Sequence, residues 1–151
     1  MVNLREKARQ KLGVSFLAEL DKVASRLKIP SIWLLGIMDS ESDMNPRANN
    51  AGTNADGSID YGLIQFNGTH TLPQYGITGN QLTNMTATQQ LAYIERYYKP
   101  TIGKVKRFGD LYLWNLSPAY FLNSPNHPTA TAFKNKVEQA YTKKNWIKPH
   151  R

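Results

Sequence analysis

A chain of 151 residues, with 40% hydrophobic and 20% charged residues, has the length and composition of one globular domain with a buried core. The lack of cysteine excludes disulfides, thiolate nucleophiles and cysteine-bound zinc, and the three scattered histidines argue against a histidine-based metal site. The net charge of +8 favours a negatively charged partner. We therefore expect a single domain over residues 1–151, with no metal and no cofactor.

The first third of the chain predicts two helices. Apolar residues recur at helical spacing from about Val14 to Leu27. A second helix is expected after Pro30, because proline suits a helix start. It should end at Asn45-Pro46, because the residue before a proline disfavours helical backbone.

The rest of the chain predicts turns first and then more helices. Residues 48–60 are so rich in Asn, Gly and Asp that we expect turns there, with short strands or a hairpin. Later helices are predicted over 86–99, with a Thr86 to Gln89 capping box, from Asp110 to a break near Pro118, and over 129–141. The predicted fold is mainly α (α+β), with a small loop or β-hairpin excursion after the second helix.

Neither a membrane span nor an export signal is predicted. The longest apolar run, residues 32–38, is far shorter than the roughly 20 residues that cross a bilayer. The first 13 residues alternate charged and apolar side chains and lack the apolar core of a signal peptide.

Glu41 is the most informative acid of the chain. It follows Leu34 by seven positions and Met38 by three, so it continues the apolar row of its helix and should be partly buried. Asp39 and Asp43 lie two positions to either side and are expected to point into solvent. By spacing alone, Glu41 fits either an acid that frames the helix end or a general acid, because burial raises the pKa of a carboxyl group.

Two motifs around and after this helix resemble a known family. "ESDMNPRA", residues 41–48, resembles the signature around the catalytic glutamate of SLT-type lytic transglycosylases, and "YGLIQF", residues 61–66, resembles the Gly-Leu-Met-Gln segment that follows it. "DGSIDYGLIQF" is also similar to the acidic loop of goose-type lysozymes, and "LAYIERYYKP" and "DLYLWNLSPA" look like the phage-encoded branch. The resemblance covers roughly residues 14–125.

The resemblance implies a lysozyme-like fold and cleavage of the β-1,4 bond between N-acetylmuramic acid and N-acetylglucosamine in peptidoglycan. Carried over by position, Glu41 is the general acid. Ser42 and Asn45 shape the turn or orient Glu41, and a saccharide groove is lined by Gly62, Leu63, Ile64 and Gln65. The later Ala-Tyr-Asn-Ala-Gly motif of the family is absent, so Tyr112 or Tyr120 is the candidate aromatic residue for sugar binding.

Two reactions are open to such a site. A lytic transglycosylase needs one carboxylate: Glu41 protonates the leaving oxygen and the 6-hydroxyl of the sugar closes a 1,6-anhydro ring. An inverting hydrolase needs a second carboxylate about 6.5–9.5 Å away, for which Asp56 is the candidate, whereas Asp60 is read as a turn residue. We prefer the transglycosylase slightly; a glycan-binding module without turnover is the third alternative.

The charge distribution fits the same interpretation. Five of the eleven acids fall between residues 39 and 60, beside the motifs, which argues against nucleic acid as the partner. We expect the partners to be peptidoglycan glycan strands and anionic polymers of the cell envelope, approached by a monomer. Without a signal peptide, a bacteriolytic phage protein would reach the wall from the virion or through a holin.

Overall fold

The computed structural model describes residues 3–52 and 54–143, and it is mainly helical with one two-stranded antiparallel hairpin, as predicted. The α-helices are α1 (Leu4–Leu12), α2 (Val14–Leu27), α3 (Ser31–Ser42), α4 (Gly79–Thr83), α5 (Ala87–Tyr98), α6 (Phe108–Leu116), α7 (Pro118–Asn123) and α8 (Pro128–Lys143). The strands are β1 (Asp60–Tyr61) and β2 (Phe66–Asn67), and two 3₁₀ helices are η1 (Leu72–Tyr75) and η2 (Lys99–Thr101). No helix within the described ranges combines the length and apolar character needed to cross a membrane.

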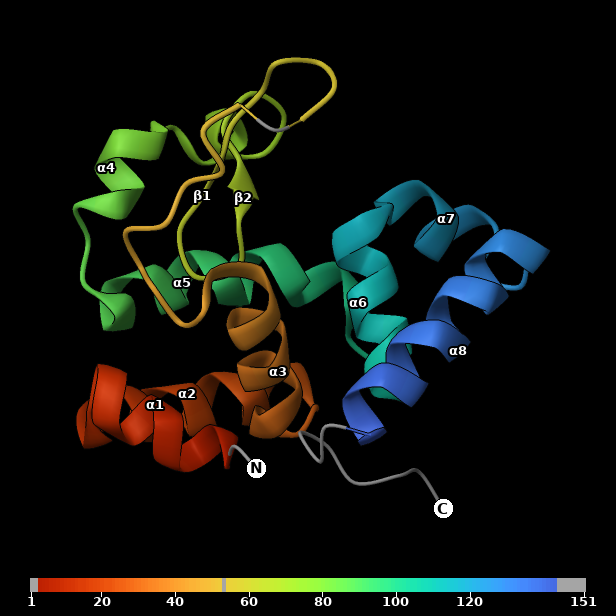
Figure 1. The fold of residues 1–151 in the computed structure, drawn as a ribbon, viewed down its shortest axis with the longest axis horizontal. Helices are drawn as coiled ribbons and strands as arrows, with labels where there is room; N and C mark the ends of the chain where they lie inside the picture. The colour runs from red at the N-terminus through yellow and green to blue at the C-terminus, as the bar shows by residue number, and fades with distance from the viewer. Residues whose placement is uncertain (1–2, 53, 144–151) are drawn as a thin grey trace.

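Helix α3 occupies the middle of the molecule. Figure 1 shows α1 and α2 beside it, the hairpin and α4 above α5, and α6, α7 and α8 together on the other side. Helix α3 contacts α1, α2 and α6, and α2 also packs along α5. Leu34, Ile37 and Met38 are fully buried, which explains why α3 can hold an acid at the end of its apolar row in a fixed place.

Helix α1 was not predicted, and it changes the environment of one acid. Its lysine Lys7 forms ion pairs with both Asp39 and Asp43 of the α3 end. The Asp39 side chain is only 5% exposed, so the prediction that it points into solvent is wrong, whereas Asp43 is 72% exposed. The docking of α1 on α3 covers Asp39 and supplies the cation that makes its burial tolerable.

The end of α3 is a tight left-handed turn. Asp43 and Met44 both adopt positive φ, 55° and 58°, a conformation that costs roughly 1–2 kcal/mol for a residue with a side chain. Full burial of Met44 and the contacts of Lys7 and Lys11 with Asp43 offset that cost. The chain therefore leaves the helix at Ser42, just before the predicted Asn45-Pro46 stop.

The hairpin lies at the end of the predicted turn region. Asp60 pairs with Asn67 and Tyr61 with Phe66, and an isolated bridge joins Asn49 to Tyr61. The four residues 62–65 form the connecting turn, in which Gly62 has φ 82°. An added Cβ on this glycine would lie 2.8 Å from the side chain of Gln90, so the turn packs directly on α5.

Helices α5 and α6 follow their sequence signals closely. The predicted capping box is present, since the Thr86 hydroxyl accepts from the Gln89 amide and the Gln89 side chain accepts from the Thr86 amide. Helix α6 begins two residues before the predicted Asp110, whose carboxylate accepts from the amides of Lys106 and Arg107. Pro118 ends this helical run as predicted and starts α7.

Close packing between α3 and α6 brings the two helices of the site together. A Cβ built on Gly36 would lie 3.0 Å from the Phe108 ring, so glycine lets α6 approach α3. Helix α8 in turn holds α6, because Lys134 lies 3.6 Å from Asp110 and the amide of Gly109 donates to Glu138.

Candidate active site

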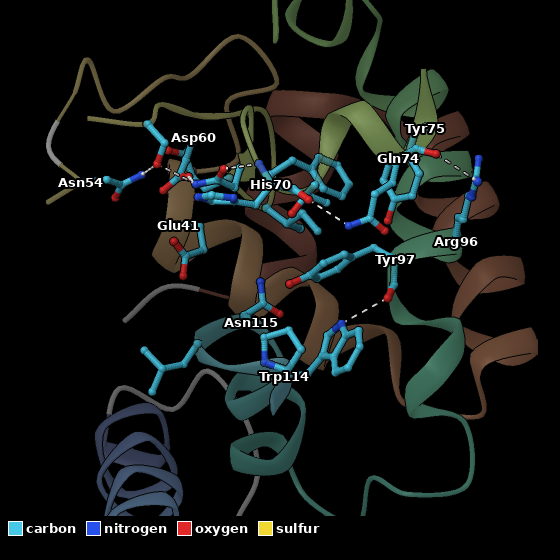
Figure 2. Close-up of a pocket in the computed structure, with 18 of the residues that line it drawn as sticks. Glu41, Asn54, Asp60, His70, Gln74, Tyr75, Arg96, Tyr97, Trp114 and Asn115 are labelled. Carbon is cyan, nitrogen blue, oxygen red and sulfur yellow. Dashed lines mark hydrogen bonds between the residues drawn. The ribbon is translucent and has the colours of Figure 1, made fainter. Parts of the chain in front are cut away.

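A groove of about 970 Å³ runs between the hairpin side of the molecule and helices α5 and α6. Its walls come from four regions: the end of α3, the loop and hairpin over residues 54–67, the segment 70–75 that contains η1, and α5 with α6. Figure 2 shows Glu41 and Asp60 toward one end and Tyr75 and Arg96 toward the other. Its volume lies at the upper end of the range for ligand sites.

Glu41 is half-buried at this groove, as its helical phase predicted. Its Oε1 accepts a hydrogen bond of 2.6 Å from the hydroxyl of Tyr112. Burial raises the pKa of Glu41, the Tyr112 bond opposes that rise, and the charge of Asp60 adds to it. Glu41 therefore combines a fixed orientation with a pKa that is raised from its ordinary value.

Tyr112 is itself the middle of a chain of hydroxyl groups. Burial and the charge of Glu41 raise the pKa of Tyr112, so its hydroxyl stays protonated and donates. The Ser40 hydroxyl lies 2.8 Å from the Tyr112 oxygen, and Tyr141 of α8 donates to Ser40. Because each hydroxyl has one proton to give, the bonds run from Tyr141 through Ser40 and Tyr112 to Glu41.

Asp56 lines the same groove in an ionised form. Its carboxylate accepts from the hydroxyl and amide of Ser58, at 2.5 and 2.9 Å, and lies 2.9 Å from Nε2 of His70. The Ser58 hydroxyl and then His70 hold the pKa of Asp56 far below its usual value. The pKa values of Glu41 and Asp56 are thus shifted in opposite directions, the first raised by burial and the second lowered by hydrogen-bond donors.

Asp60 was expected to be a turn residue, but it lies in strand β1 and also has an effect on Glu41. Its carboxylate accepts from the side-chain amides of Asn50 and Asn67, at 3.0 and 3.1 Å, which closes the hairpin. It also lines the groove, and its negative charge is the one that adds to the raised pKa of Glu41. Asp60 is therefore a strand residue at the groove rather than a turn residue.

The predicted Gly62–Gln65 segment divides into a wall and a support. Ile64 and Gln65 line the groove, while Gly62 and Leu63 belong to the turn behind it. Gln65 has φ 60°, and its side-chain amide donates to the carbonyls of Gly62 and Ala48, at 3.0 and 3.3 Å. Its donor is thereby committed to the loop, and the side-chain oxygen is the group left to accept from a ligand.

Two polar side chains fix this turn against the helices. The Ser42 hydroxyl lies 2.7 Å from the Leu63 carbonyl and accepts from the Asn45 amide at 3.2 Å, so Ser42 and Asn45 shape the turn rather than line the groove. The buried Gln90 accepts from the Leu63 amide at 3.1 Å and donates to the Pro46 carbonyl at 2.7 Å. Gln90 had no distinguishing signal, because it reads as one more polar residue in a helix.

The opposite wall contains residues that the sequence did not single out. Tyr97, Trp114 and Asn115 line the groove, and Figure 2 shows Tyr97 and Asn115 pointing into the space next to Glu41. Trp114 donates from Nε1 to the Tyr97 carbonyl at 3.1 Å, and Tyr98 donates to Oδ1 of Asn115. The sequence could have predicted Asn115 as a site residue, because it lies one helical turn after the candidate Tyr112 on the same helix.

Neither tyrosine proposed for sugar binding is part of the groove lining. Tyr112 lies behind Glu41 as its hydrogen-bond donor, and Tyr120 on α7 packs against His127 with ring centres 5.4 Å apart. Within the described residues, no group of three or more His, Cys, Asp or Glu side chains is placed to hold a metal ion.

Comparisons with protein-family models, with curated proteins and with solved structures give no match to this chain. The likeness to lytic transglycosylases and goose-type lysozymes therefore stays a prediction that depends on the two motifs.

Proposed function

We propose that the protein cleaves the β-1,4 glycosidic bond of peptidoglycan between N-acetylmuramic acid and N-acetylglucosamine, with Glu41 as general acid. The observation that carries the proposal is the half-buried Glu41 carboxyl at a groove, with its pKa raised by burial and one oxygen held by Tyr112. A carboxyl that keeps its proton near neutral pH is what protonation of a glycosidic oxygen requires.

The preferred reaction is lytic transglycosylation. Glu41 gives its proton to the glycosidic oxygen as the bond from that oxygen to C1 breaks, and the N-acetyl carbonyl of the substrate assists at C1. The 6-hydroxyl of the same sugar then bonds to C1 and returns its proton to Glu41. The product carries a 1,6-anhydro ring, and no water is consumed.

An inverting hydrolase is the second candidate, and one observation favours it. Asp56 and Asp60 line the same groove as Glu41, so a second carboxylate is available there. The strongly lowered pKa of Asp56 leaves it ionised but makes it a weak base. In that reaction one water adds across the bond, and the new chain end is an ordinary reducing sugar. The mass of the products therefore separates the two mechanisms by one water.

The test is Glu41→Gln, an exchange that keeps the shape of the side chain and the acceptor for Tyr112. We expect loss of about 10²–10⁴-fold in the clearing of purified cell walls, the usual contribution of a general acid. The matched control is Glu19→Gln on α2, which lies away from the groove and should lyse normally. Lysis by Glu41→Gln at the wild-type rate would refute the proposal.

The products of the wild-type digest decide the mechanism. Ends lacking one water support the transglycosylase. If all ends are reducing and Asp56→Asn is inactive, the hydrolase is correct.

A further inference from the structure

Arg96 stands at the end of the groove away from the acids. It is exposed on α5, and it is the one lysine or arginine among the described residues that line the groove. Its guanidinium carbon lies 4.6 Å from the centre of the Tyr75 ring, and Nη2 donates to the Gln74 carbonyl at 3.4 Å. Figure 2 shows Arg96 beside these two residues and across the groove from Asn54 and Asp60.

The positive charge of Arg96 is not neutralised by the part of the chain that the structure describes. No carboxylate among those residues lies within ion-pair distance of its guanidinium, and the neighbouring Glu95 pairs instead with Arg26 at 2.7 Å. A guanidinium has five N–H donors in a planar fork, and the weak bond to Gln74 uses one of them. The stacking on Tyr75 orients the remaining donors, which suit a carboxylate.

The two ends of the groove therefore carry opposite charge. The ionised Asp56 and the nearby Asp60 would repel an acidic substituent at one end, while Arg96 would attract it at the other. Such an arrangement fixes the direction in which a glycan with acidic substituents lies.

We propose that Arg96 binds a carboxylate carried by the glycan and is a specificity-determining residue of the groove. The inference rests on the proposed function, because peptidoglycan bears free carboxylates on its peptides, and the lactyl group of muramic acid bears one wherever the peptide is missing. Arg96 thereby favours peptidoglycan over neutral polymers of N-acetylglucosamine.

The experiment compares Arg96→Gln with Lys104→Gln, which removes the same charge from an exposed position outside the groove. Each variant is assayed on purified peptidoglycan and on the same peptidoglycan with its carboxylates converted to neutral amides by carbodiimide coupling to methylamine. We expect Arg96→Gln to lose about tenfold in kcat/KM on native walls, as for one charge-assisted hydrogen bond, and about twofold or less on amidated walls. Equal losses for Arg96→Gln on both walls, or equal losses for both variants on native walls, would overturn the inference.

A third substrate identifies the carboxylate. Strands stripped of peptide by an amidase lose the peptide carboxylates and gain a free lactyl carboxylate at each muramic acid. A loss for Arg96→Gln that persists on them shows that Arg96 can bind the lactyl group. A loss confined to intact walls assigns the peptide carboxylates, and either result supports the proposal.

Binding to insoluble walls, measured by sedimentation, keeps this test separate from the proposed activity. If no variant and no wild type cleaves, the proposed function fails. Weaker binding of Arg96→Gln to native but not amidated walls would still support the role of Arg96, and unchanged binding would refute it.

Discussion

Tyr112→Phe tests whether the hydrogen bond to Glu41 sets the properties of the acid. The variant loses the hydroxyl and keeps the ring, which packs on Phe108 and Tyr141 with ring centres 5.7 and 6.0 Å away. The lost bond is 2.6 Å long and goes to a carboxyl oxygen. A hydrogen bond to a charged group contributes about 1.5–3 kcal/mol, and one to a neutral group about 1 kcal/mol.

The stability loss should therefore depend on pH. Because the pKa of Glu41 is raised, the folded state holds this proton more tightly than the unfolded chain does. The stability gained from that proton is full below the ordinary carboxyl pKa and is lost as the pH rises through the folded-state value. At pH values above the folded-state pKa of Glu41, where the carboxylate is charged, we expect Tyr112→Phe to lower the free energy of unfolding by about 2 kcal/mol, or Tm by about 4–8 °C. At pH 4 the loss should be about half as large.

The pH dependence of activity gives an independent measurement. The Tyr112 bond lowers the pKa of Glu41, so its removal raises that pKa further. Because the proposed reaction needs protonated Glu41, the alkaline limb of kcat/KM against pH should move to higher pH in Tyr112→Phe. The assay is wall clearing from pH 4 to 9.

Tyr120→Phe is the control, since it removes a tyrosine hydroxyl on α7 away from the groove lining. Its alkaline limb should match that of the wild type. An unchanged limb in Tyr112→Phe, or a limb displaced to lower pH, would show that the reasoning about this hydrogen bond is wrong.

Asp60→Asn should move the alkaline limb of kcat/KM to lower pH, because the charge of Asp60 helps to raise the pKa of Glu41. An alkaline limb that stays in place would contradict this electrostatic contribution. Gly62→Ala should destabilise the fold by about 2–4 kcal/mol in urea unfolding, because it combines a positive φ with a contact of 2.8 Å to Gln90. Gly57→Ala has the same sign of φ but open space around it, so it should cost about 1 kcal/mol; equal losses in the two variants would rule out the packing contribution.

The helix that carries Glu41 was predictable because its signals are local. The apolar row of α3 and the Asn45-Pro46 stop lie close together in the sequence, and both are properties of this one helix. The Thr86 to Gln89 box is local in the same way. Periodicity therefore predicted the position of Glu41 on its helix and its partial burial, and the proline predicted where the chain leaves the helix.

Helix α1 was missed because its stability comes mostly from partners elsewhere. Only Leu4 and Ala8 are buried along it, so it lacks a long apolar row, and Arg5 pairs with Asp21 of α2 at 3.0 Å. A local signal was present, since Asn3 caps the helix by accepting from the Glu6 amide.

The far wall of the groove was missed for a related reason. Tyr97 on α5 and Trp114 on α6 are ordinary aromatic residues of helix faces. Trp114 acquires its place in the groove wall from the packing of α6 against α3. That contact depends on Gly36, which leaves room for Phe108, and no periodicity reports such a long-range fit. Arg96 likewise acquires its place in the groove from its contact with Tyr75.

The fold gives the acidic residues between positions 39 and 60 different partners and different charges nearby. Lys7 pairs with Asp39 and Asp43, and His70 and Ser58 hold Asp56. Asp60 is the member whose charge acts on Glu41. The cluster thus works as four local environments rather than as one negative patch. A single acid, Glu41, has burial as the first cause of a raised pKa, and that difference separates the proposed proton donor from the other four carboxyl groups.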